Sequence, residues 1–227
     1  MRDSIIQFFK NTIAFKYTLP YGNIEKSIYT TIDNDFCFSN SNNDDFAKII
    51  YESIVDYCFN EADFNDSENL NDLQIEAISQ RLRFEDEDSD TTKEKYGFYG
   101  EVIFNLMLRV LFKTTPIIAK GYFYDILKPE ENKGYDSFHL TKTQRSTCLW
   151  FGEVKFHQSY KTAVDSVFKN IENAISNDYF RKNLLAITPR RANLNISDDT
   201  INNLLNQLRH SPKTSIEELQ SEFSLKG

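Results

Sequence analysis

An apolar run near the middle of the chain, Cys148–His157, ends in charge and limits the folds that the chain can adopt. Read as a β-strand, its side chains alternate between two faces. One face is apolar throughout, and the other begins with Leu149 and Phe151 and ends with Glu153 and Lys155. A strand this apolar on both faces is typical of an α/β sheet that is covered on both sides. Burying an acid and an amine at its end is costly unless each has a partner, so these charges indicate a functional role.

The residues before this run predict a separate N-terminal region. A turn signal around Pro20 predicts a hairpin or two short strands within residues 10–38, and apolar spacing predicts helices over residues 44–58 and 73–82. Residues 85–90 are charged or polar throughout, which is typical of a solvated linker. We therefore divide the chain into an N-terminal α+β region (residues 1–84), an acidic linker (85–95) and a second domain (96–227).

The second domain has a regular alternation of helical and strand patterns. The predicted elements are a helix over residues 97–113, strands over 116–127, 135–140 and 147–157, a helix over 163–175 and a strand over 184–188. Two further helices follow, one from Asp198 to near Leu208 and one from Ser215 to Phe223. The order α-β-β-β-α-β predicts an α/β (α+β) fold with a central mixed sheet flanked by helices. The first three strands can form an antiparallel meander, and the helix after them makes a crossover to the fourth.

The charge of the chain is negative and unevenly distributed. The net charge is −8, with 14 Lys and Arg against 25 Asp and Glu in residues 1–139, and 12 against 9 in residues 140–227. A negative chain is a poor candidate for a protein that wraps nucleic acid by itself. The basic excess of the C-terminal part allows that part to face a polyanion. The acidic surface also has a simpler explanation, which is solubility.

Several protein classes are excluded by what the sequence does not contain. No stretch reaches the roughly 18 apolar residues of a membrane span, and the N-terminus lacks the apolar region of a secretory signal. The three cysteines, Cys37, Cys58 and Cys148, have no CxxC spacing, which argues against a zinc site and is consistent with the cytoplasm. No glycine-rich phosphate loop occurs, so we expect no ATP site in this chain.

Three residues with the chemistry of a metal site should meet if the strand order is right. Asp136 lies at the start of the second predicted strand, and Glu153 and Lys155 lie at the end of the third. In an antiparallel pair these ends are adjacent, so Asp136 and Glu153 become neighbours. Two adjacent carboxylates repel each other unless a cation lies between them, and hard oxygen ligands suit Mg²⁺ or Mn²⁺. Such a metal can polarise a phosphodiester and activate a water, and Lys155 can orient that water, help to deprotonate it or neutralise developing charge.

Glu101 is a fourth candidate, because it lies in the first turn of the helix over residues 97–113. Gly97 and Gly100 would let this end of the helix approach the sheet, so that Glu101 could join the metal ligands. An acid in a first turn also stabilises a helix without any catalytic duty.

Five further residues are candidates for binding the substrate: His157, Gln158, Tyr160, Arg190 and Arg191. The first three follow Lys155 along the chain, and the arginine pair follows a buried-looking segment and a proline. Each also has a plain explanation as a polar strand end, a helix start or a solvated pair. His139 lies on the opposite strand face from Asp136 if alternation holds, and we expect it to be structural.

Three segments together resemble a known family. Glu101, Asp136 and Glu153-Val154-Lys155 on an α-β-β-β-α-β frame resemble the PD-(D/E)xK nuclease superfamily over roughly residues 97–190, although Tyr135 stands where its nominal motif has proline. Residues 98–101, 134–139 and 149–156 are similar to the HamA family, the nuclease effectors of Hachiman anti-phage defence, and to the related AbpA subunits. The resemblance implies a restriction-endonuclease-like core, with Asp136, Glu153 and Lys155 as catalytic residues and Glu101 in support.

The resemblance also implies a partner, a HamB-like helicase that binds ATP and restrains the nuclease until phage attack or damaged DNA is sensed. The expected activity is that of a Mg²⁺-dependent DNA endonuclease within that complex, and the acidic N-terminal region is where we expect the helicase to bind. One alternative is a catalytically silent adaptor or sensor with a nuclease fold. A stand-alone restriction-type endonuclease is a weaker alternative because of the negative net charge.

Overall fold

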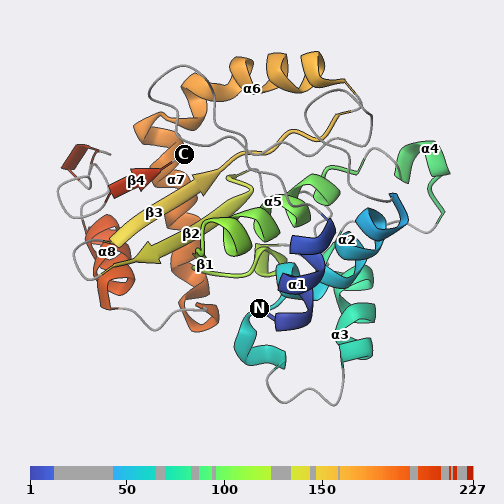
Figure 1. The fold of residues 1–227 in the computed structure, drawn as a ribbon. Helices are drawn as coiled ribbons and strands as arrows, with labels where there is room; N and C mark the ends of the chain where they lie inside the picture. Colours follow the sequence, from blue (N-terminus) through green and yellow to red (C-terminus); the bar gives the residue numbers. More distant parts are fainter. Residues whose placement is uncertain are drawn as a thin grey trace.

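A small mixed sheet lies between helices at the centre of the fold (Figure 1). The structure, a computed structural model, describes residues 1–12, 43–64, 70–82, 87–93, 96–123, 134–143, 147–157, 159–194, 199–210, 215, 217–218 and 224–226. Over these residues the chain is a mixed α and β protein in which helices predominate. None of the helices described is long and apolar enough to cross a membrane.

The sheet has the strand order β1-β2-β3-β4, with one parallel pair at its edge. Its strands are β1 (Thr115–Pro116), β2 (Ser137–Lys142), β3 (Thr147–Gly152) and β4 (Ser224–Lys226). The pairs β1–β2 and β2–β3 are antiparallel, and β4 is parallel to β3. The β2 and β3 pair has Ser137 opposite Gly152. The pairing therefore brings the start of β2 to the end of β3, as predicted.

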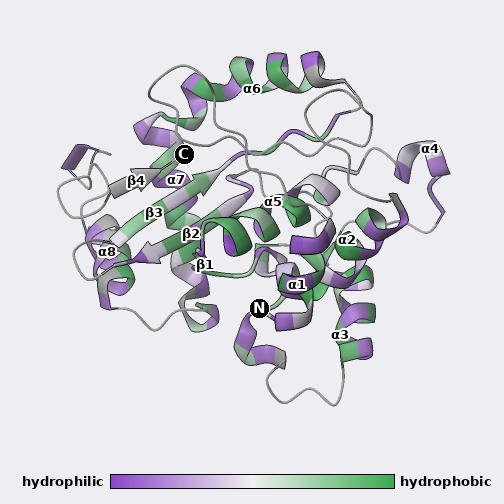
Figure 2. Cartoon of the chain, in the orientation of Figure 1, coloured by the Kyte–Doolittle hydropathy of each residue, from purple (hydrophilic) through white to green (hydrophobic). Residues whose placement is uncertain are grey.

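Helices cover both faces of the sheet. On one face, α5 (Phe98–Leu111) packs so that Phe104 contacts Gly152. On the other face, α7 (Asn177–Ile187) and α8 (Asp199–His210) enclose an apolar core with the strands. In that core the Phe151 and Phe180 rings lie 4.8 Å apart. Hydrophobic residues are concentrated in α5 and the neighbouring strands, whereas α4 (Asp90–Lys93) is largely hydrophilic (Figure 2).

The N-terminal helices pack on α5 rather than apart from it. They are α1 (Asp3–Thr12), α2 (Asn43–Cys58), the 3-10 helix η1 (Glu61–Phe64), α3 (Leu70–Glu76) and the π-helical turn η2 (Ala77–Arg81). Buried Ile5, Phe9 and Ile49 belong to the same core as Val102 and Leu106 of α5. Helix α5 therefore joins the N-terminal helices to the sheet, and the division into two domains at residues 85–95 stays a prediction.

Most of the predicted helices are confirmed. Helix α2 covers the predicted segment 44–58, α5 covers most of 97–113, and α8 begins at Asp199. The segment 73–82 is helical through α3 and η2. Helix α6 (Tyr160–Ala174) begins where the Ser159 side chain accepts a hydrogen bond from the backbone of Thr162, which is an N-cap.

The predicted strand over residues 184–188 is wrong, because this segment is the last turn of α7 and the start of the 3-10 helix η4 (Thr188–Asn193). A short apolar run is ambiguous between a strand and a buried helix end. Phe180, Leu184 and Ile187 recur at helical spacing and are all buried, and Ser176 caps the helix. The strand that runs parallel to β3 is β4, about forty residues further along the chain.

The other predicted strands differ from the observed strands in their bounds. Of the first strand, predicted over residues 116–127, β1 includes Pro116, the 3-10 helix η3 (Lys120–Phe123) follows, and residues 124–127 lie outside the described residues. The second begins at Ser137 and the third ends at Gly152, so Glu153 and Lys155 lie beyond the strand and not on it. Of the predicted hairpin, residues 10–12 belong to α1, and residues 13–42 lie outside the described residues. Of the predicted last helix, residues 217 and 218 are helical and most of the others lie outside the described residues.

Candidate functional site

The start of β2 and the end of β3 bring Asp136 next to the segment that contains Glu153. The Asp136 backbone N–H donates to the Gly152 carbonyl at 2.8 Å, which continues the ladder by one residue. The Val154 N–H donates to Asp136 Oδ2 at 2.6 Å. Asp136 and Glu153 are therefore neighbours, as antiparallel pairing predicts. Both residues lie just outside the strands, so their carboxylates lie at the end of the β2 and β3 pair.

Two glycines let α5 approach this edge closely. A Cβ atom on Gly100 would lie 2.8 Å from Cβ of Phe156, and one on Gly152 would lie 2.0 Å from Cε1 of Phe104. Neither distance is possible for a real side chain without a shift of its neighbours. Glycine at both positions therefore brings the first turn of α5, which carries Glu101, against the segment after β3.

Glu101 is buried and held by partners from two directions. Its exposed fraction is 5%, and its Oε2 accepts a hydrogen bond from the Tyr57 hydroxyl of α2. The same oxygen lies 3.7 Å from Nζ of Lys120. A carboxylate this deeply buried is costly unless it is paired and hydrogen-bonded, and here it has both kinds of partner. The predicted approach of Glu101 to the sheet edge is confirmed.

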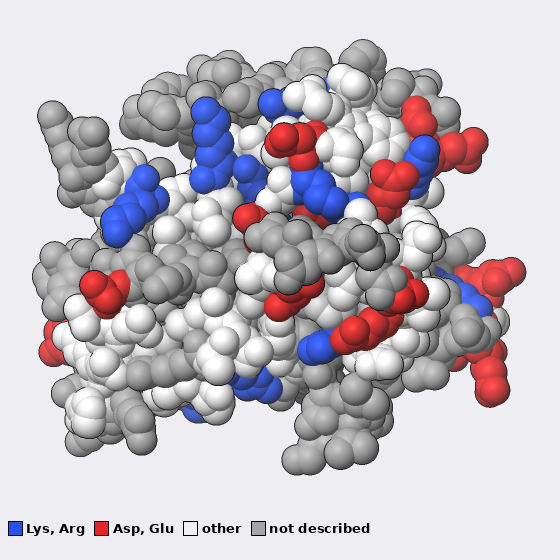
Figure 3. Space-filling model, turned by 90° about the horizontal axis from the view of Figure 1, so that it is seen from below, with Lys and Arg blue, Asp and Glu red and all other residues white. Residues whose placement is uncertain are grey.

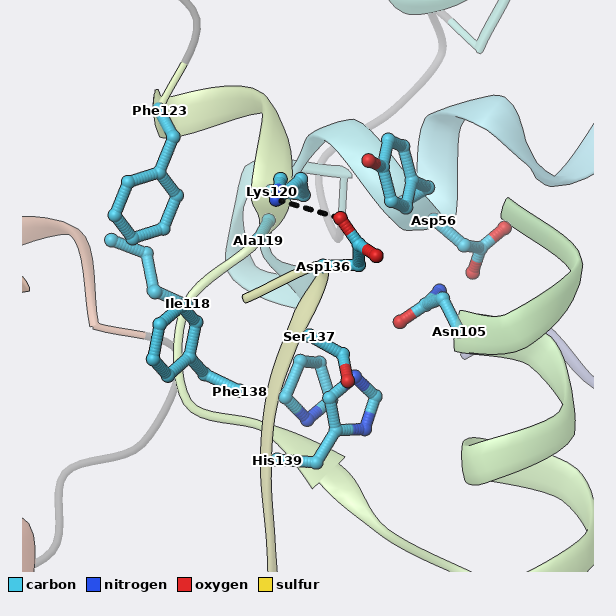
Figure 4. A pocket seen from close by; sticks show the side chains of 12 residues that line it. Asp56, Asn105, Ile118, Ala119, Lys120, Phe123, Asp136, Ser137, Phe138 and His139 are labelled. Atoms are coloured by element: carbon cyan, nitrogen blue, oxygen red, sulfur yellow. Dashed lines mark ion pairs between the residues drawn. The ribbon is translucent and has the colours of Figure 1, made fainter. Parts of the chain in front are cut away.

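Lys120, which the sequence analysis did not select, lies between two of the carboxylates. Its Nζ is 3.7 Å from Glu101 Oε2 and 4.0 Å from Asp136 Oδ1, and it donates to the Tyr135 carbonyl at 2.8 Å. Its side chain is only 10% exposed. Figure 4 shows the Lys120 side chain turned toward Asp136 at one end of a small cavity. A signal was available, because Lys120 follows the apolar segment 117–119 directly, as Glu153 follows an apolar strand.

Glu153 and Lys155 form a close pair at the end of β3. Lys155 Nζ donates to Glu153 Oε1 at 2.5 Å, and the two side chains are 23% and 24% exposed. The other carboxylate oxygen, Oε2, is buried, and no group among the described residues donates a hydrogen bond to it. A buried charged oxygen without a donor is unfavourable, so this oxygen is suited to a cation or a water.

The surroundings of Asp136 perturb its ionisation. Burial raises the pKa of Asp136 to about 7, and the nearby charges of Glu101 and Glu153 act in the same direction. The Lys120 ammonium and the Val154 N–H oppose this rise in the pKa of Asp136 without cancelling it. Perturbed carboxyl groups of this kind are concentrated at functional sites.

Lys155 is kept in its charged form. Partial burial disfavours the ammonium, but the hydrogen bond and the charge of Glu153 outweigh burial and raise the pKa of Lys155 above its usual value. Asp136 adds to that rise. Lys155 is therefore a positive charge at neutral pH.

The residues that could hold a divalent metal are Asp136 and Glu153, with Glu101 behind them. Across the part of the chain that the structure describes, no three His, Cys, Asp or Glu side chains are grouped as a metal site. Mg²⁺ is usually held by one or two carboxylates together with waters and substrate phosphates. Asp136, which adjoins Glu153, and the unpaired Glu153 Oε2 fit that pattern. A site with Glu101 as a third direct ligand does not fit, because Lys120 lies between it and Asp136.

A polar cavity lies behind Asp136, between α5 and β2 (Figure 4). Asn105, Ser137 and His139 are among its lining residues. His139 is 2% exposed and hydrogen-bonded to the Thr114 hydroxyl at 2.7 Å. Burial, with a smaller effect of Arg109, lowers the pKa of His139 to about 3, so the imidazole is neutral at physiological pH. The burial and the hydrogen bond of His139 are consistent with the structural role expected for it, which stays a prediction.

The five candidates for substrate binding are not brought together with the carboxylates by any described contact. His157 is exposed on the segment before α6. Arg190 donates to the carbonyls of Tyr122 and Ala186, at 2.8 and 2.9 Å, and its guanidinium lies over the Phe123 ring. Gln158 and the side chains of Tyr160 and Arg191 lie outside the described residues. Binding of substrate by these residues stays a prediction.

Acidic and basic side chains are interleaved on the face of the molecule seen in Figure 3. Among the described residues on this face, the basic side chains do not form one continuous patch. Proteins that hold nucleic acid by themselves usually present such a patch to the phosphates.

The Tyr57 hydroxyl should contribute measurably to stability, because it is the donor that holds the buried Glu101 carboxylate. We expect Tyr57→Phe to lower the free energy of unfolding by about 1.5–3 kcal/mol, the usual contribution of a hydrogen bond to a charged group. Urea denaturation measures this difference. Tyr51→Phe is the matched control, because Tyr51 is on the same helix and 54% exposed. Equal losses from both substitutions would contradict the role of Tyr57.

Comparison with known proteins identifies the family. No curated protein and no solved structure matches the chain. The model of the HamA family matches residues 7–219, which is most of the sequence and includes Glu101, Asp136, Glu153 and Lys155. The chain therefore belongs to the HamA family, which connects it with Hachiman anti-phage defence.

Proposed function

We propose that this chain is a metal-dependent DNA endonuclease, the effector of a Hachiman defence complex, which hydrolyses phosphodiester bonds when a helicase partner releases it. The observation that carries the proposal is the meeting of Asp136 with the Glu153 and Lys155 pair at one edge of the sheet. Two carboxylates beside a lysine are the groups that metal-assisted phosphodiester hydrolysis needs. Membership of the HamA family supports the defence role.

We also propose that residues 96–227 form a restriction-endonuclease-like core. Helix α5 is followed by the antiparallel strands β1, β2 and β3, then by α6, and finally by β4 parallel to β3. This order is similar to α-β-β-β-α-β, but the last strand is β4 and not the predicted segment 184–188, and α7 and α8 precede it. The candidate site lies where the central strands β2 and β3 end.

In this proposal Asp136 and Glu153 hold Mg²⁺ or Mn²⁺ through carboxylate oxygens. When bound, the metal would polarise the phosphodiester and lower the pKa of a water. The Val154 N–H fixes one oxygen of Asp136, and the Lys155 ammonium fixes one oxygen of Glu153. The second oxygen of Glu153 has no donor among the described residues, and the second oxygen of Asp136 lies 4.0 Å from the Lys120 ammonium.

Lys155 contributes positive charge beside the reacting phosphate. The raised pKa of Lys155 keeps the ammonium protonated at neutral pH, which disfavours it as the base that takes a proton from water. A charged amine instead neutralises the negative charge that develops on the phosphate oxygens and orients the attacking water by donating to its oxygen. Of the roles that the sequence leaves open for Lys155, charge neutralisation is the one we propose.

The proposed partner accounts for the charge of the chain. With a net charge of −8, the chain is a poor candidate for binding DNA by itself. A HamB-like helicase that binds both ATP and DNA would deliver the substrate to the site. The N-terminal region is the surface we propose for its docking, since residues 1–84 carry 14 Asp and Glu against 7 Lys and Arg.

Metal-dependent cleavage tests the proposal. The purified chain together with its helicase partner and ATP should cut DNA in Mg²⁺ or Mn²⁺, and excess EDTA should abolish the cleavage. Gel electrophoresis of supercoiled and linear DNA measures the products. The helicase alone with the same metal is the control, because it carries the ATP site but not these carboxylates. Intact DNA in every condition, with a complex that hydrolyses ATP, would reject the nuclease.

A second candidate function is a catalytically silent adaptor or sensor of the helicase complex. The observation in its favour is that the described residues include no group of three metal-binding side chains. Calorimetric titration with Mn²⁺ discriminates between the two functions. A site that disappears in Asp136→Asn supports the nuclease, and the absence of any site in the unaltered chain supports the adaptor.

A further inference from the structure

The Lys120 ammonium occupies the space between two buried carboxylates. It lies within 4.0 Å of an oxygen of both Glu101 and Asp136, and all three side chains are 12% exposed or less. Two carboxylates this close need a cation, and a lysine is one that the chain itself can supply. The pocket at Asp136 thus already contains a positive charge.

The backbone that carries Lys120 is fixed on both sides, to the last residue of α2 and to Asn60 just after it. The preceding residue, Ala119, donates its N–H to the Asn60 side chain at 2.9 Å. A Cβ atom on the following residue, Gly121, would lie 2.3 Å from the Cys58 carbonyl oxygen. The main chain of η3 therefore packs directly against the end of α2. The flexible part is the four-carbon side chain of Lys120, which can change rotamer without movement of the fold.

We propose that Lys120 is a resident counter-ion, which a divalent metal must displace from Asp136 before the site can be loaded. The inference rests on the proposed metal-dependent function and adds to it a competitor for the metal. A dication held by Asp136 and Glu153 would be repelled by an ammonium 4.0 Å from the same carboxylate. Lys120 is thus a positioning residue that weakens metal binding, and it keeps the site in an unloaded state.

A charge-removing substitution at Lys120 should therefore tighten metal binding. We expect Lys120→Met to bind Mn²⁺ at least about tenfold more tightly than the unaltered chain, because a neighbouring charge changes such equilibria by one or more powers of ten. Lys120→Arg keeps the charge and should bind Mn²⁺ as weakly as the unaltered chain does. Lys169→Met is the matched control, since Lys169 is exposed on α6. Calorimetry and the electron paramagnetic resonance signal of free Mn²⁺ measure the affinity without any need for cleavage.

The possible outcomes separate this inference from the proposed function. Tighter binding by Lys120→Met alone supports the counter-ion. Equal or weaker binding by Lys120→Met overturns it, while loss of the site in Asp136→Asn would still support the metal-dependent function. Absence of Mn²⁺ binding in every variant overturns both. Circular dichroism checks that Lys120→Met folds, and Lys120→Gln provides the same comparison if it does not.

Discussion

Replacement of Glu153 by glutamine should abolish DNA cleavage and leave the fold intact. Glutamine keeps the volume of the side chain and an oxygen that accepts from Lys155, but it has no charge with which to hold a metal. Even residues that only support a metal ligand usually contribute 10- to 100-fold, so loss of a ligand should lower the cleavage rate by at least about 100-fold. Glu153 is partly exposed, and we expect the free energy of unfolding to change by less than about 1 kcal/mol.

The measurement is the initial rate of cleavage by the complex at saturating Mg²⁺. Glu172→Gln is the matched control, because Glu172 is exposed on α6 and far along the chain from the strand end. Lys155→Met should lose activity to a similar degree if its charge is what the reaction uses. Unchanged rates in Glu153→Gln would remove this residue from the proposed site, whatever the result for Lys155.

Replacement of Asp136 by asparagine should make the metal-free protein more stable at pH 8. The pKa of Asp136 is raised from about 4 in an unfolded chain to about 7 in the fold. A raised pKa means that this group stabilises the fold below pH 4 and that this contribution is lost as the pH rises through 7. At pH 8 the buried charge is fully formed, and asparagine removes it while still accepting from the Val154 N–H. We expect Asp136→Asn to gain about 2–4 kcal/mol.

Urea denaturation in EDTA at pH 5 and pH 8 measures this gain. The advantage of Asp136→Asn should be largest at pH 8 and should shrink toward pH 5. The neutral His139 gives a pH dependence of its own, since its lowered pKa costs stability as the pH falls below 6.5, but both proteins share it. Asp165→Asn, an exposed change on α6, is the control. If Asp136→Asn is less stable than the unaltered chain at both pH values, the charged Asp136 carboxylate does not destabilise the fold and the prediction is wrong.

The same experiment links stability to the proposed metal. A ligand that binds only the folded state raises the free energy of unfolding. Saturating Mn²⁺ at pH 8 should therefore stabilise the unaltered chain and have no effect on Asp136→Asn. The residue that weakens the metal-free fold would then be the residue through which the metal stabilises it.

The helices were largely predictable from the sequence, because their signals are local. Apolar spacing and first-turn acids predict α2 and α8, and the apolar spacing of α5 is equally regular. The error at residues 184–188 arose where apolar residues are too few to distinguish a strand from the end of a helix. Ser176, whose side chain caps α7, was the local signal that would have resolved it.

The candidate site was predictable in part, for a related reason. Antiparallel pairing brings strand ends together whatever the details of packing, so the proximity of Asp136 and Glu153 followed from strand order alone. Gly100 indicated that Glu101 could approach them. Tyr57 comes from a helix with no pattern that connects it to the sheet, and the one signal for Lys120 is that it follows the apolar segment 117–119.

The sequence alone was enough to predict three features: the charged pair Glu153 and Lys155 after an apolar strand, its neighbour Asp136, and the family of the chain. These features depend on motif and strand order. Only the tertiary structure decided that β3 ends at Gly152, that α2 and α5 share a core, and that Lys120 lies between Glu101 and Asp136. The physical reason is that these features depend on packing between distant segments, such as Gly121 against Cys58. Such contacts follow from the shapes of whole side chains in three dimensions and leave no periodicity in the sequence.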